Sequence, residues 1–287
     1  MDKKAHQLLK NYGIIKNILD EITKQKEYVT TLKQSILQEA IQGKLTADWR
    51  AKHSDVEGAS ELLKRIKAEK ALRQAQGKIK KEKPLPPIME EEIPFKLPQG
   101  WVWCRFKEIV SYRKGKKPEV LVTEKSKEYS IPYIDIAAFE KGQIKQFTND
   151  STVVLCNNEN ILLVWDGSRM GLVGTNVKGA VGSTLARIDL YQTEKDFLFT
   201  LLKSKFVFFN SNPKQAGLPH MNGPLLDNMI IGLPLLSEQK AIVEKVESLM
   251  QKVSAMEEEI QKSEQNAEML MQAVLKEAFE GKEEVEV

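Results

Sequence analysis

Cationic side chains gather in a short loop in the middle part of the chain. Residues 112–118 (YRKGKKP) combine an aromatic residue and a glycine with four cations, Arg113, Lys114, Lys116 and Lys117. Lysine and arginine in such a loop neutralise phosphates and release the counterions of a nucleic acid. A solvated hairpin tip has the same composition, so the pattern alone leaves both interpretations open.

A second loop, residues 165–169 (WDGSR), follows an apolar run, so its polar side chains emerge at the end of a predicted strand. Arg169 has the fork geometry that pairs with guanine O6 and N7, and Asp166 can accept from the amino group of cytosine. Trp165 and Ser168 complete this candidate site. The alternative is that Asp166 closes a turn and Trp165 belongs to the core.

Two further segments carry groups that can contact DNA. Residues 178–184 (KGAVGST) contain two glycines, where a backbone approaches something closely, either DNA or a neighbouring strand. Residues 213–222 (PKQAGLPHMN) form a polar loop, and glutamine and asparagine can pair with adenine. The candidate DNA contacts in these two segments are Lys178, Ser183, Thr184, Lys214, Gln215, His220 and Asn222.

The sequence lacks the motifs of most catalytic sites. It has neither a Gly-Lys-Ser/Thr phosphate loop nor the Asn-Pro-Pro-aromatic tetrapeptide of an adenine methyltransferase. Its three histidines, His6, His53 and His220, lie in different segments, which predicts neither a metal site nor a catalytic triad. Cys104 and Cys156 lie in apolar runs and are expected to be buried free thiols.

The elements that must position these loops begin and end with two related helices. Apolar residues recur in alternating steps of three and four, which predicts a heptad a/d face on each helix. These residues are Ile15, Ile18, Ile22, Val29, Leu32 and Ile36 near the N-terminus, and Val246, Leu249, Val253, Met256, Ile260, Leu270 and Val274 near the C-terminus. Such faces must bury each other or like faces of a second molecule, because exposed apolar stripes are costly in water.

The predicted fold is α+β, with one globular domain between the two long helices. We expect a spacer helix in residues 1–45, a connector in 46–96, a DNA-binding domain in 97–236 and a second spacer helix in 237–287. The first helix should span residues 4–42. Six short runs rich in β-branched and aromatic residues predict strands in the domain (WVWCRF, SIPYIDI, STVVLC, NILLVWD, GLVGTNV and STLARIDL), and residues 197–210 predict one buried helix.

Local signals predict how several helices begin and end. Gly43 is a candidate C-cap of the first helix, and Ser237 is a candidate N-cap of the last one, with Glu238 in its first turn. The connector should hold a short helix over residues 59–76 that begins with Ser60 as its N-cap. The apolar side of this short helix should consist of Leu62, Leu63, Ile66 and Leu72.

The rest of the connector, residues 77–98, has too many prolines for a helix or a sheet and should be extended. Its basic run, residues 78–83 (KIKKEK), is either a solvated linker or a nonspecific phosphate contact.

Net charge is unevenly distributed along the chain. Residues 1–96 and 97–236 carry about +6 and +4, whereas residues 237–287 carry about −7, within a total of +3. The basic parts suit an acidic polymer and the acidic helix suits a protein partner. No apolar run reaches the 18 residues of a membrane span, and no signal peptide opens the chain. We therefore expect a cytoplasmic protein without a membrane partner.

The order of several motifs resembles the specificity subunits of type I restriction–modification systems. The similar segments are GKLTADWRAKH (residues 43–53), LPQGWVWCRFKEI (97–109), YIDI (133–136), NILLVWDGS (160–168), GAVGSTLARI (179–188) and LPLLSEQKAIVEKVESLM (233–250). They cover nearly the whole chain and are collinear. Full-length members of this family are expected to have the order recognition domain, helix, recognition domain, helix. This chain starts at the first helix. It therefore resembles a half-length form with one target recognition domain, either a natural half-subunit or a fragment.

The resemblance implies a DNA-recognition and scaffolding subunit without enzymatic activity. Double-stranded DNA, modification (methyltransferase) subunits and restriction (endonuclease) subunits are the implied partners. S-adenosylmethionine, ATP and magnesium would be bound by those partners, with no cofactor bound by this chain. A full bipartite target would need a second copy of the chain, and two copies related by a twofold axis would read an inverted repeat. The base sequence of the target does not follow from the residues.

Two other functions remain open from the residues alone. One is a coiled-coil adaptor whose globular domain binds protein and shows no DNA sequence preference. The other is a nuclease built on the carboxylates of Asp135, Glu140 and Asp166.

Overall fold

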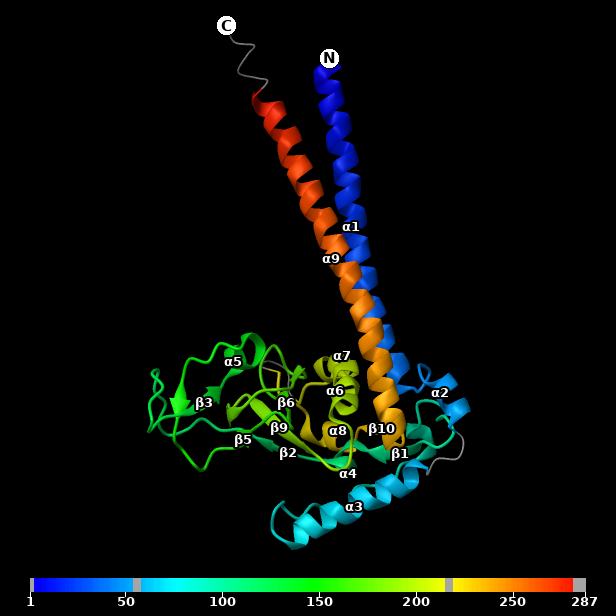
Figure 1. Ribbon diagram of the computed structural model, residues 1–287, viewed down its shortest axis with the longest axis vertical. Coiled ribbons are helices and arrows are strands. Elements are labelled where there is room, and N and C mark those ends of the chain that lie inside the picture. The colour runs from blue at the N-terminus through cyan, green and yellow to red at the C-terminus, as the bar shows by residue number, and fades with distance from the viewer. Residues whose placement is uncertain (1–2, 54–57, 215–218, 281–287) are drawn as a thin grey trace. The chain divides into compact units, whose positions relative to one another are not determined.

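The structure, a computed structural model, describes residues 3–53, 58–214 and 219–280 (Figure 1). The chain divides into two compact units. The first unit consists of residues 1–36 and 246–287, and the second of residues 37–245. The second unit contains the connector together with the predicted DNA-binding domain. Among the described residues, none of the helices combines the length and the apolar character that crossing a membrane requires.

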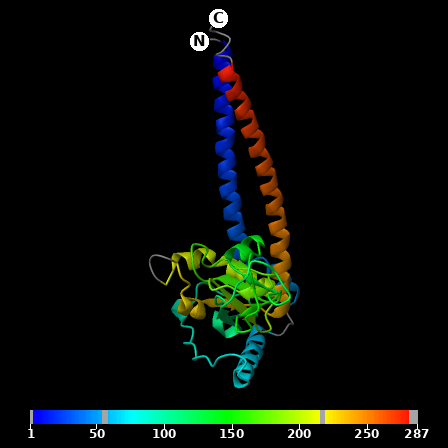
Figure 2. The ribbon, with the colours of Figure 1, turned by 90° about the vertical axis from the view of Figure 1, so that its left-hand side faces the viewer.

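The first unit is an antiparallel pair of helices. Helix α1 (Lys3–Ile41) and helix α9 (Leu236–Glu280) confirm both predicted long helices, and Figures 1 and 2 show them side by side with opposite chain directions. Lys33 Nζ lies 2.6 Å from Glu257 Oε1, and Lys26 Nζ lies 2.5 Å from Glu264 Oε2. Residue numbers thus fall on α1 as they rise on α9, which fixes the antiparallel direction.

Only one row of each predicted heptad face is buried in this pair. The buried residues are Ile15, Ile22, Val29 and Ile36 on α1 and Val246, Val253 and Ala267 on α9, while Ile260 and Val274 are half-buried. The alternate row is largely in water: Ile18 is 42% exposed, Leu32 40%, Met256 52% and Leu270 56%, with Leu249 half-buried. Two helices cover only one side of each other's stripe, so an apolar row remains on the surface.

Glycine ends α1 as the sequence predicts. Gly43 has a φ of +70°, and the amide of Lys44 donates to the carbonyl of Glu39 at 3.0 Å. This left-handed C-cap satisfies a carbonyl of the last turn. A Cβ on Gly43 would lie 2.8 Å from the ring of Trp101, so the position also requires the smallest residue.

The predicted N-cap of α9 is wrong. The helix begins at Leu236, and the amide of Gln239 donates to the carbonyl of Leu235 at 3.0 Å, so Ser237 lies inside the first turn. Glu238 does lie in that turn, as predicted.

The connector holds two helices, α2 (Ala47–Lys52) and α3 (Ala59–Ala75), followed by a short 3-10 turn, η1 (Glu90–Glu92). The sequence did not predict helix α2. Helix α3 is capped by Gly58, so the expected N-cap at Ser60 is also wrong. Residues 80–89 form neither helix nor strand, as predicted for the proline-rich part, but η1 is a helical turn inside the segment that was expected to hold none.

Helix α3 buries a different row from the predicted one. Leu62, Leu63 and Ile66 are buried, but Leu72 is 57% exposed and Lys70 is buried in its place. Lys70 follows Ile66 by four residues and so lies on the same face, whereas Leu72 does not. The lysine is buried because backbone carbonyls and a carboxylate surround its ammonium group.

The central domain contains three small sheets. Strands β1 (Val102–Arg105) and β10 (Ile230–Leu233) form an antiparallel pair. The second sheet has the order β2-β9-β6-β7 and consists of Val110–Lys114, Leu185–Leu190, Ile161–Val164 and Val173–Gly174. The third has the order β4-β3-β8-β5 and consists of Phe147–Thr148, Ile131–Ile134, Gly179–Val181 and Leu155–Cys156. Strands β3 and β8 are parallel, and the neighbouring strands elsewhere in these sheets are antiparallel.

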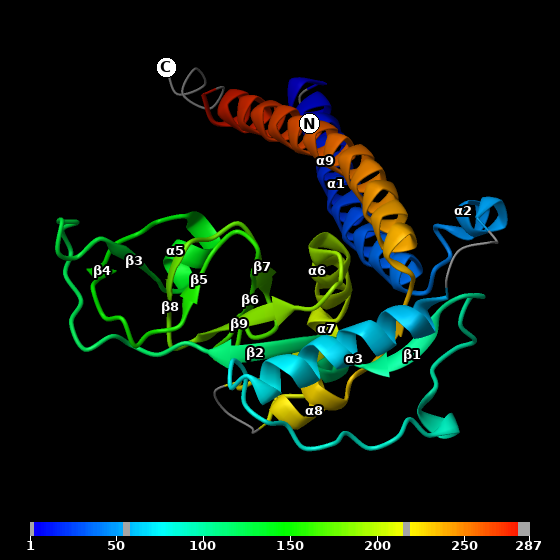
Figure 3. The same cartoon turned by 60° about the horizontal axis from the view of Figure 1, so that its bottom comes forward.

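Short helices connect and cover the sheets. They are α4 (Phe106–Ile109), α5 (Ile136–Lys141), α6 (Lys195–Ser204), α7 (Phe206–Ser211) and α8 (Gly223–Asn228). The predicted single helix over residues 197–210 is thus interrupted at Lys205 and forms α6 and α7. Helix α3 lies against α4 and β1 on one side of the domain (Figure 3).

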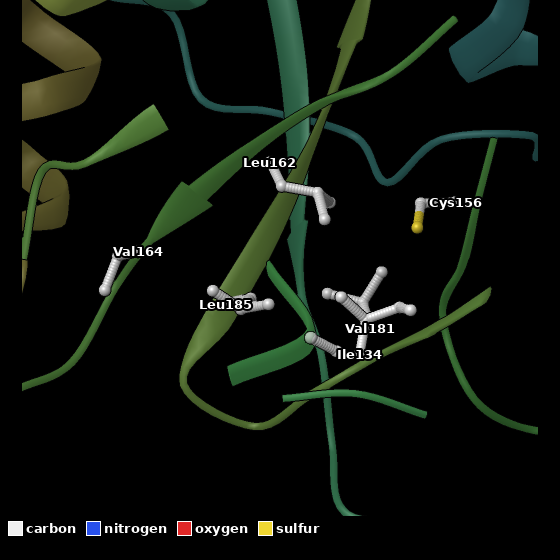
Figure 4. Close-up of a cluster of buried hydrophobic side chains, with 7 residues drawn as sticks. Ile134, Cys156, Leu162, Val164, Val181 and Leu185 are labelled. Carbon is white, nitrogen blue, oxygen red and sulfur yellow. The ribbon is translucent and has the colours of Figure 1, made fainter. Parts of the chain in front are cut away.

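An apolar core joins the second and third sheets (Figure 4). Ile134 and Val181 of the third sheet pack with Leu162, Val164 and Leu185 of the second. Cys156 belongs to this core, and both it and Cys104 are buried free thiols, as predicted. The α+β class predicted from the sequence is confirmed.

A buried carboxylate connects the start of α9 with the beginning of the second unit. The side chain of Glu238 has no exposed surface. It accepts hydrogen bonds from Thr46 Oγ1 at 2.7 Å and from the indole nitrogen of Trp101 at 2.7 Å, and it pairs with the guanidinium of Arg50. A buried charge is stable only when it is paired and hydrogen-bonded in this way.

We expect Glu238→Gln to lower the free energy of unfolding of the second unit by about 3 kcal/mol, because removing one partner leaves the Arg50 charge poorly compensated. Urea denaturation followed by tryptophan fluorescence measures this, since all four tryptophans lie in that unit. The matched control is Glu259→Gln, whose side chain is 73% exposed on the same helix; it should cost less than about 0.5 kcal/mol. Equal effects of the two substitutions would contradict the role of Glu238.

Candidate nucleic-acid interface

Three of the predicted loops meet at Asp166. Its Oδ1 lies 2.6 Å from Nδ1 of His220, and its Oδ2 lies 2.5 Å from Nζ of Lys114. Backbone hydrogen bonds join two of these loops, from Gly167 N to Pro219 O and from Met221 N to Trp165 O, both at 2.8 Å. The structure therefore brings the ends of distant loops to one place, with Asp166 holding a cation and an imidazole. The sequence predicted neither of these partners for Asp166.

The backbone of the segment between β8 and β9 joins this meeting point. The amides of Trp165 and Asp166 donate to the carbonyl of Thr184 at 2.8 and 3.3 Å. Trp165 is half-buried, and its ring centroid lies 5.2 Å from that of Tyr112 on β2. Burial, together with the hydrogen bond to Asp227, raises the pKa of the Tyr112 hydroxyl, which therefore stays protonated. Tyr112 and Trp165 thus pack together beneath the loops as uncharged side chains.

Every predicted cation is exposed to solvent. The exposed side chains are Arg113, Lys114, Lys116, Lys117, Arg169, Lys178 and Lys214. Some of them make surface ion pairs: Arg169 with Glu140 at 3.1 Å and Arg113 with Asp189 at 3.8 Å. The cation of each pair is exposed, whereas the carboxylates of Glu140 and Asp189 are only 19% and 21% exposed. The exposed guanidinium groups of Arg169 and Arg113 are therefore accessible to a phosphate.

Lys116 is held by different partners from Lys114. Its Nζ lies 2.5 Å from the hydroxyl of Thr152 and 4.0 Å from Asp150 Oδ2. Hydrogen bonds from Thr152 lower the pKa of Asp150, so that carboxylate is ionised at neutral pH. Arg169 is likewise directed to α5 through Glu140. The loop candidates consequently form a central group at Asp166 with outlying cations around it.

Gly115 of the first loop lies where the backbone approaches another segment closely, whereas the four cations of that loop are exposed. A Cβ on Gly115 would lie 2.1 Å from the carbonyl oxygen of Val181 and 2.3 Å from that of Gly182. Its amide donates to Leu185 O at 2.9 Å, so the chain after β2 is packed against the β8–β9 segment. The glycines of that segment have the same role: a Cβ on Gly182 would lie 2.5 Å from Ile134 O. The neighbouring-strand alternative is correct for these glycines.

The remaining candidates are less tightly placed. Asn222 is the N-cap of α8, with its side-chain oxygen accepting from Leu225 N at 3.2 Å. Ser168 and Ser183 are exposed. Gln215 lies outside the described residues. The partners Glu140, Thr152 and Asp227 were missed, because nothing local in the sequence marks a contact between segments so far apart.

The carboxylates of the nuclease alternative are not gathered. Asp135 caps α5 by accepting from Ala138 N at 2.8 Å, while Glu140 and Asp166 are each paired with cations. Within the described ranges, no group of three or more His, Cys, Asp or Glu side chains could hold a metal ion.

Residues 98–265 match the family model for the type I restriction modification DNA specificity domain. The chain belongs to this family. It is similar to the EcoAI specificity subunit of Escherichia coli, with 31% identity over 270 residues that cover 86% of this chain and 44% of the relative. It is also 35% identical over 150 residues to the MjaVIII specificity subunit of Methanocaldococcus jannaschii, which covers 51% of this chain and 35% of the relative. The chain thus spans less than half the length of these curated relatives.

Solved structures agree on the fold of the specificity domain and its helices. The HsdS subunit from Thermoanaerobacter tengcongensis superposes with a TM-score of 0.56 at 17% identity, covering 97% of this chain and 57% of that one. A chain from a structure of type I R-M complex assembly and conformational transition has a TM-score of 0.56 at 20% identity, covering 89% of this chain and 59% of that one. At these identities the likeness concerns the fold.

Gly115→Ala should destabilise the specificity domain by about 1–3 kcal/mol, because the added methyl group must displace the Val181 and Gly182 carbonyls or β2 itself. The same substitution at Gly13 in α1, where nothing lies within 4 Å, should stabilise the helix by about 0.5–1 kcal/mol. Urea denaturation measures both effects. Tryptophan fluorescence follows the unfolding of the second unit for the first variant, and circular dichroism follows the helices for the second variant. A Gly115→Ala domain as stable as the original would contradict the close packing.

Proposed function

We propose that this specificity-family chain recognises a DNA sequence and acts as the scaffold of a type I restriction–modification complex. The specificity domain would read one half of a bipartite target through the loops around Asp166. Its own chemistry would be limited to binding, while partner subunits methylate adenine and cleave DNA. The observation that carries the proposal is that the family-matched domain displays all seven predicted cations to solvent, around loops that end together.

The division of chemistry follows from the same arrangement. We propose that S-adenosylmethionine, ATP and magnesium are bound by the modification and restriction subunits, which act in the cytoplasm, where DNA lies. The antiparallel helix pair would serve as a rod that these subunits and a second copy of the chain contact. Its exposed apolar row supports this, because residues such as Met256 and Leu270 would otherwise remain in water.

The most direct test is the methylation pattern of a host that carries this chain with its partner subunits. A bipartite, symmetric methylated motif is the expected result, since two copies related by a twofold axis read the same half-site in opposite directions. In a mobility-shift experiment the chain should prefer selected duplexes over random ones. A chain that shows no preference for any sequence would instead be a protein-binding adaptor.

Base reading and phosphate binding are separable by substitution. Arg169→Ala should cost about 1–3 kcal/mol of binding and relax the preference at one base pair, because the guanidinium would leave Glu140 to pair with guanine. The double variant Lys116→Ala, Lys117→Ala should weaken binding to all duplexes and lower the salt slope by about one unit for each lost contact. Selection from random duplexes and a salt titration measure both, each variant serving as the control of the other. An unaltered selected motif would exclude base reading by Arg169, and an unaltered slope would exclude phosphate contact at the two lysines.

Pairing with a second copy should depend on the exposed row. Ile18→Asp combined with Leu32→Asp should dissociate the oligomer while leaving the intrachain pair intact, because both side chains are about 40% exposed in it. Multi-angle light scattering gives the mass. Ile14→Asp, at a residue 49% exposed outside the heptad row, is the matched control and should leave the mass unchanged. Ile22→Asp, at a buried position, should reduce helicity in circular dichroism instead. A chain that is monomeric without any substitution would refute self-pairing.

A further inference from the structure

A basic groove lies between the connector and strand β2, and it shares Arg113 and Lys114 with the first of the loops that meet at Asp166. It has a volume of about 740 Å³. Its charged lining residues are Lys78, Lys80, Lys81, Glu82, Arg113 and Lys114. A separate depression of about 580 Å³ shares Lys78 and Arg113 with it, but is also lined by the carboxylates of Glu159, Asp189 and Glu194. Five of the six charged side chains in the first groove are cations.

A buried arginine fixes the proline-rich part of the connector to the domain. Arg105 on β1 is 3% exposed, and its guanidinium donates to the carbonyls of Pro86 and Pro87, both at 2.9 Å. It also pairs with Glu92 of η1 at 2.9 Å. Prolines carry no amide donor but keep a free carbonyl, which suits them to a guanidinium fork. The proline-rich part of the connector is therefore strapped to the domain at residues 86–92.

A buried lysine holds Glu82, an acidic residue of the groove lining, against the domain. Lys70 on α3 donates to Val110 O at 2.8 Å and to the carbonyl of Lys107, and it pairs with Glu82 at 3.0 Å. Burial lowers the pKa of Lys70, and the hydrogen bond from its ammonium to Glu82 opposes that shift. The ion pair holds the connector at the end of its basic run. It also neutralises Glu82, the acid that lines the groove.

The lysines of the basic run are left as the uncompensated charges of the groove. Lys78, Lys80 and Lys81 are exposed, and within the part of the chain that the structure describes no carboxylate forms a salt bridge with them. By contrast, Lys114 is paired with Asp166 and Arg113 lies near Asp189. An anion in the groove would thus meet three free ammonium groups on a connector that is held in place before binding.

We infer that this groove binds the phosphates of one strand of the DNA duplex that the specificity domain reads. The inference rests on the proposed function and adds the connector lysines Lys78, Lys80 and Lys81 to the interface. Continuity supports it, because Arg113 and Lys114 line the groove and Lys114 also belongs to the Asp166 group. Lysines contact phosphates as point charges, so this part of the interface sets position and affinity without reading bases.

The experiment compares the full chain with a variant carrying Lys78→Ala, Lys80→Ala and Lys81→Ala. Affinity for a selected duplex and for a random duplex is measured across a range of salt concentrations. The slope of log K against log salt should fall in magnitude by about 2–3 units, since each lost phosphate contact removes about 0.9. The ratio of the affinities for the selected and random duplexes should stay the same.

Two control variants separate the groove from net charge. Lys10→Ala, Lys16→Ala and Lys24→Ala remove the same charge from the exposed side of α1 and should leave the slope unchanged. Replacing the three connector lysines by arginine should preserve it. An unchanged slope in the groove variant, or an equal fall in the α1 variant, would overturn the inference. So would a groove variant that loses binding to single-stranded RNA while its duplex binding stays intact. Absence of any sequence preference in the unsubstituted chain would overturn the proposed function instead.

Discussion

A single buried carboxylate joins three segments of the second unit: the one after α1, the start of the domain and the first turn of α9. Glu238 is wholly removed from water and is stable there because it is paired with Arg50 and hydrogen-bonded by Thr46 and Trp101. Its partners come from the segment after α1 and from the start of the domain, while Glu238 itself opens α9. One charge network thus fixes the end of one helix, the beginning of the other and the first tryptophan of the domain. Any shift of these elements would leave a charge unpaired in a dry environment.

In the helix pair, the apolar face of each helix is wider than the surface that the other helix covers. Burial of the row that includes Ile22 and Val253 accounts for the association of α1 with α9. The row that includes Leu32 and Met256 stays largely exposed in this pair. Under the proposed function, the specificity domain would present cations to DNA phosphates, and the helix pair would present apolar side chains to protein partners.

Local patterns predicted the elements far better than their contacts. The heptad steps predicted both long helices, each of the six β-branched and aromatic runs contains a strand, and Gly43 ends α1. The errors came where tertiary structure overrides local preference: Lys70 replaces Leu72 on the buried face of α3 because carbonyls and Glu82 surround its ammonium. The meeting of Asp166 with His220, 54 residues away, has no local signal at all. Candidate residue types could be chosen from the sequence, but which of them lie together could not.

The strapped connector has a consequence for exchanging reading modules between related subunits. A junction between residues 96 and 97 would separate Arg105 from its proline carbonyls and Lys70 from the carbonyls of α4 and β2. The exchanged domain would then leave both buried cations without their acceptors. Junctions inside the long helices, where the compact units divide at residues 36–37 and 245–246, cut neither network. Viable recombinants should therefore inherit the connector and the domain as one cassette, with crossovers in the rod.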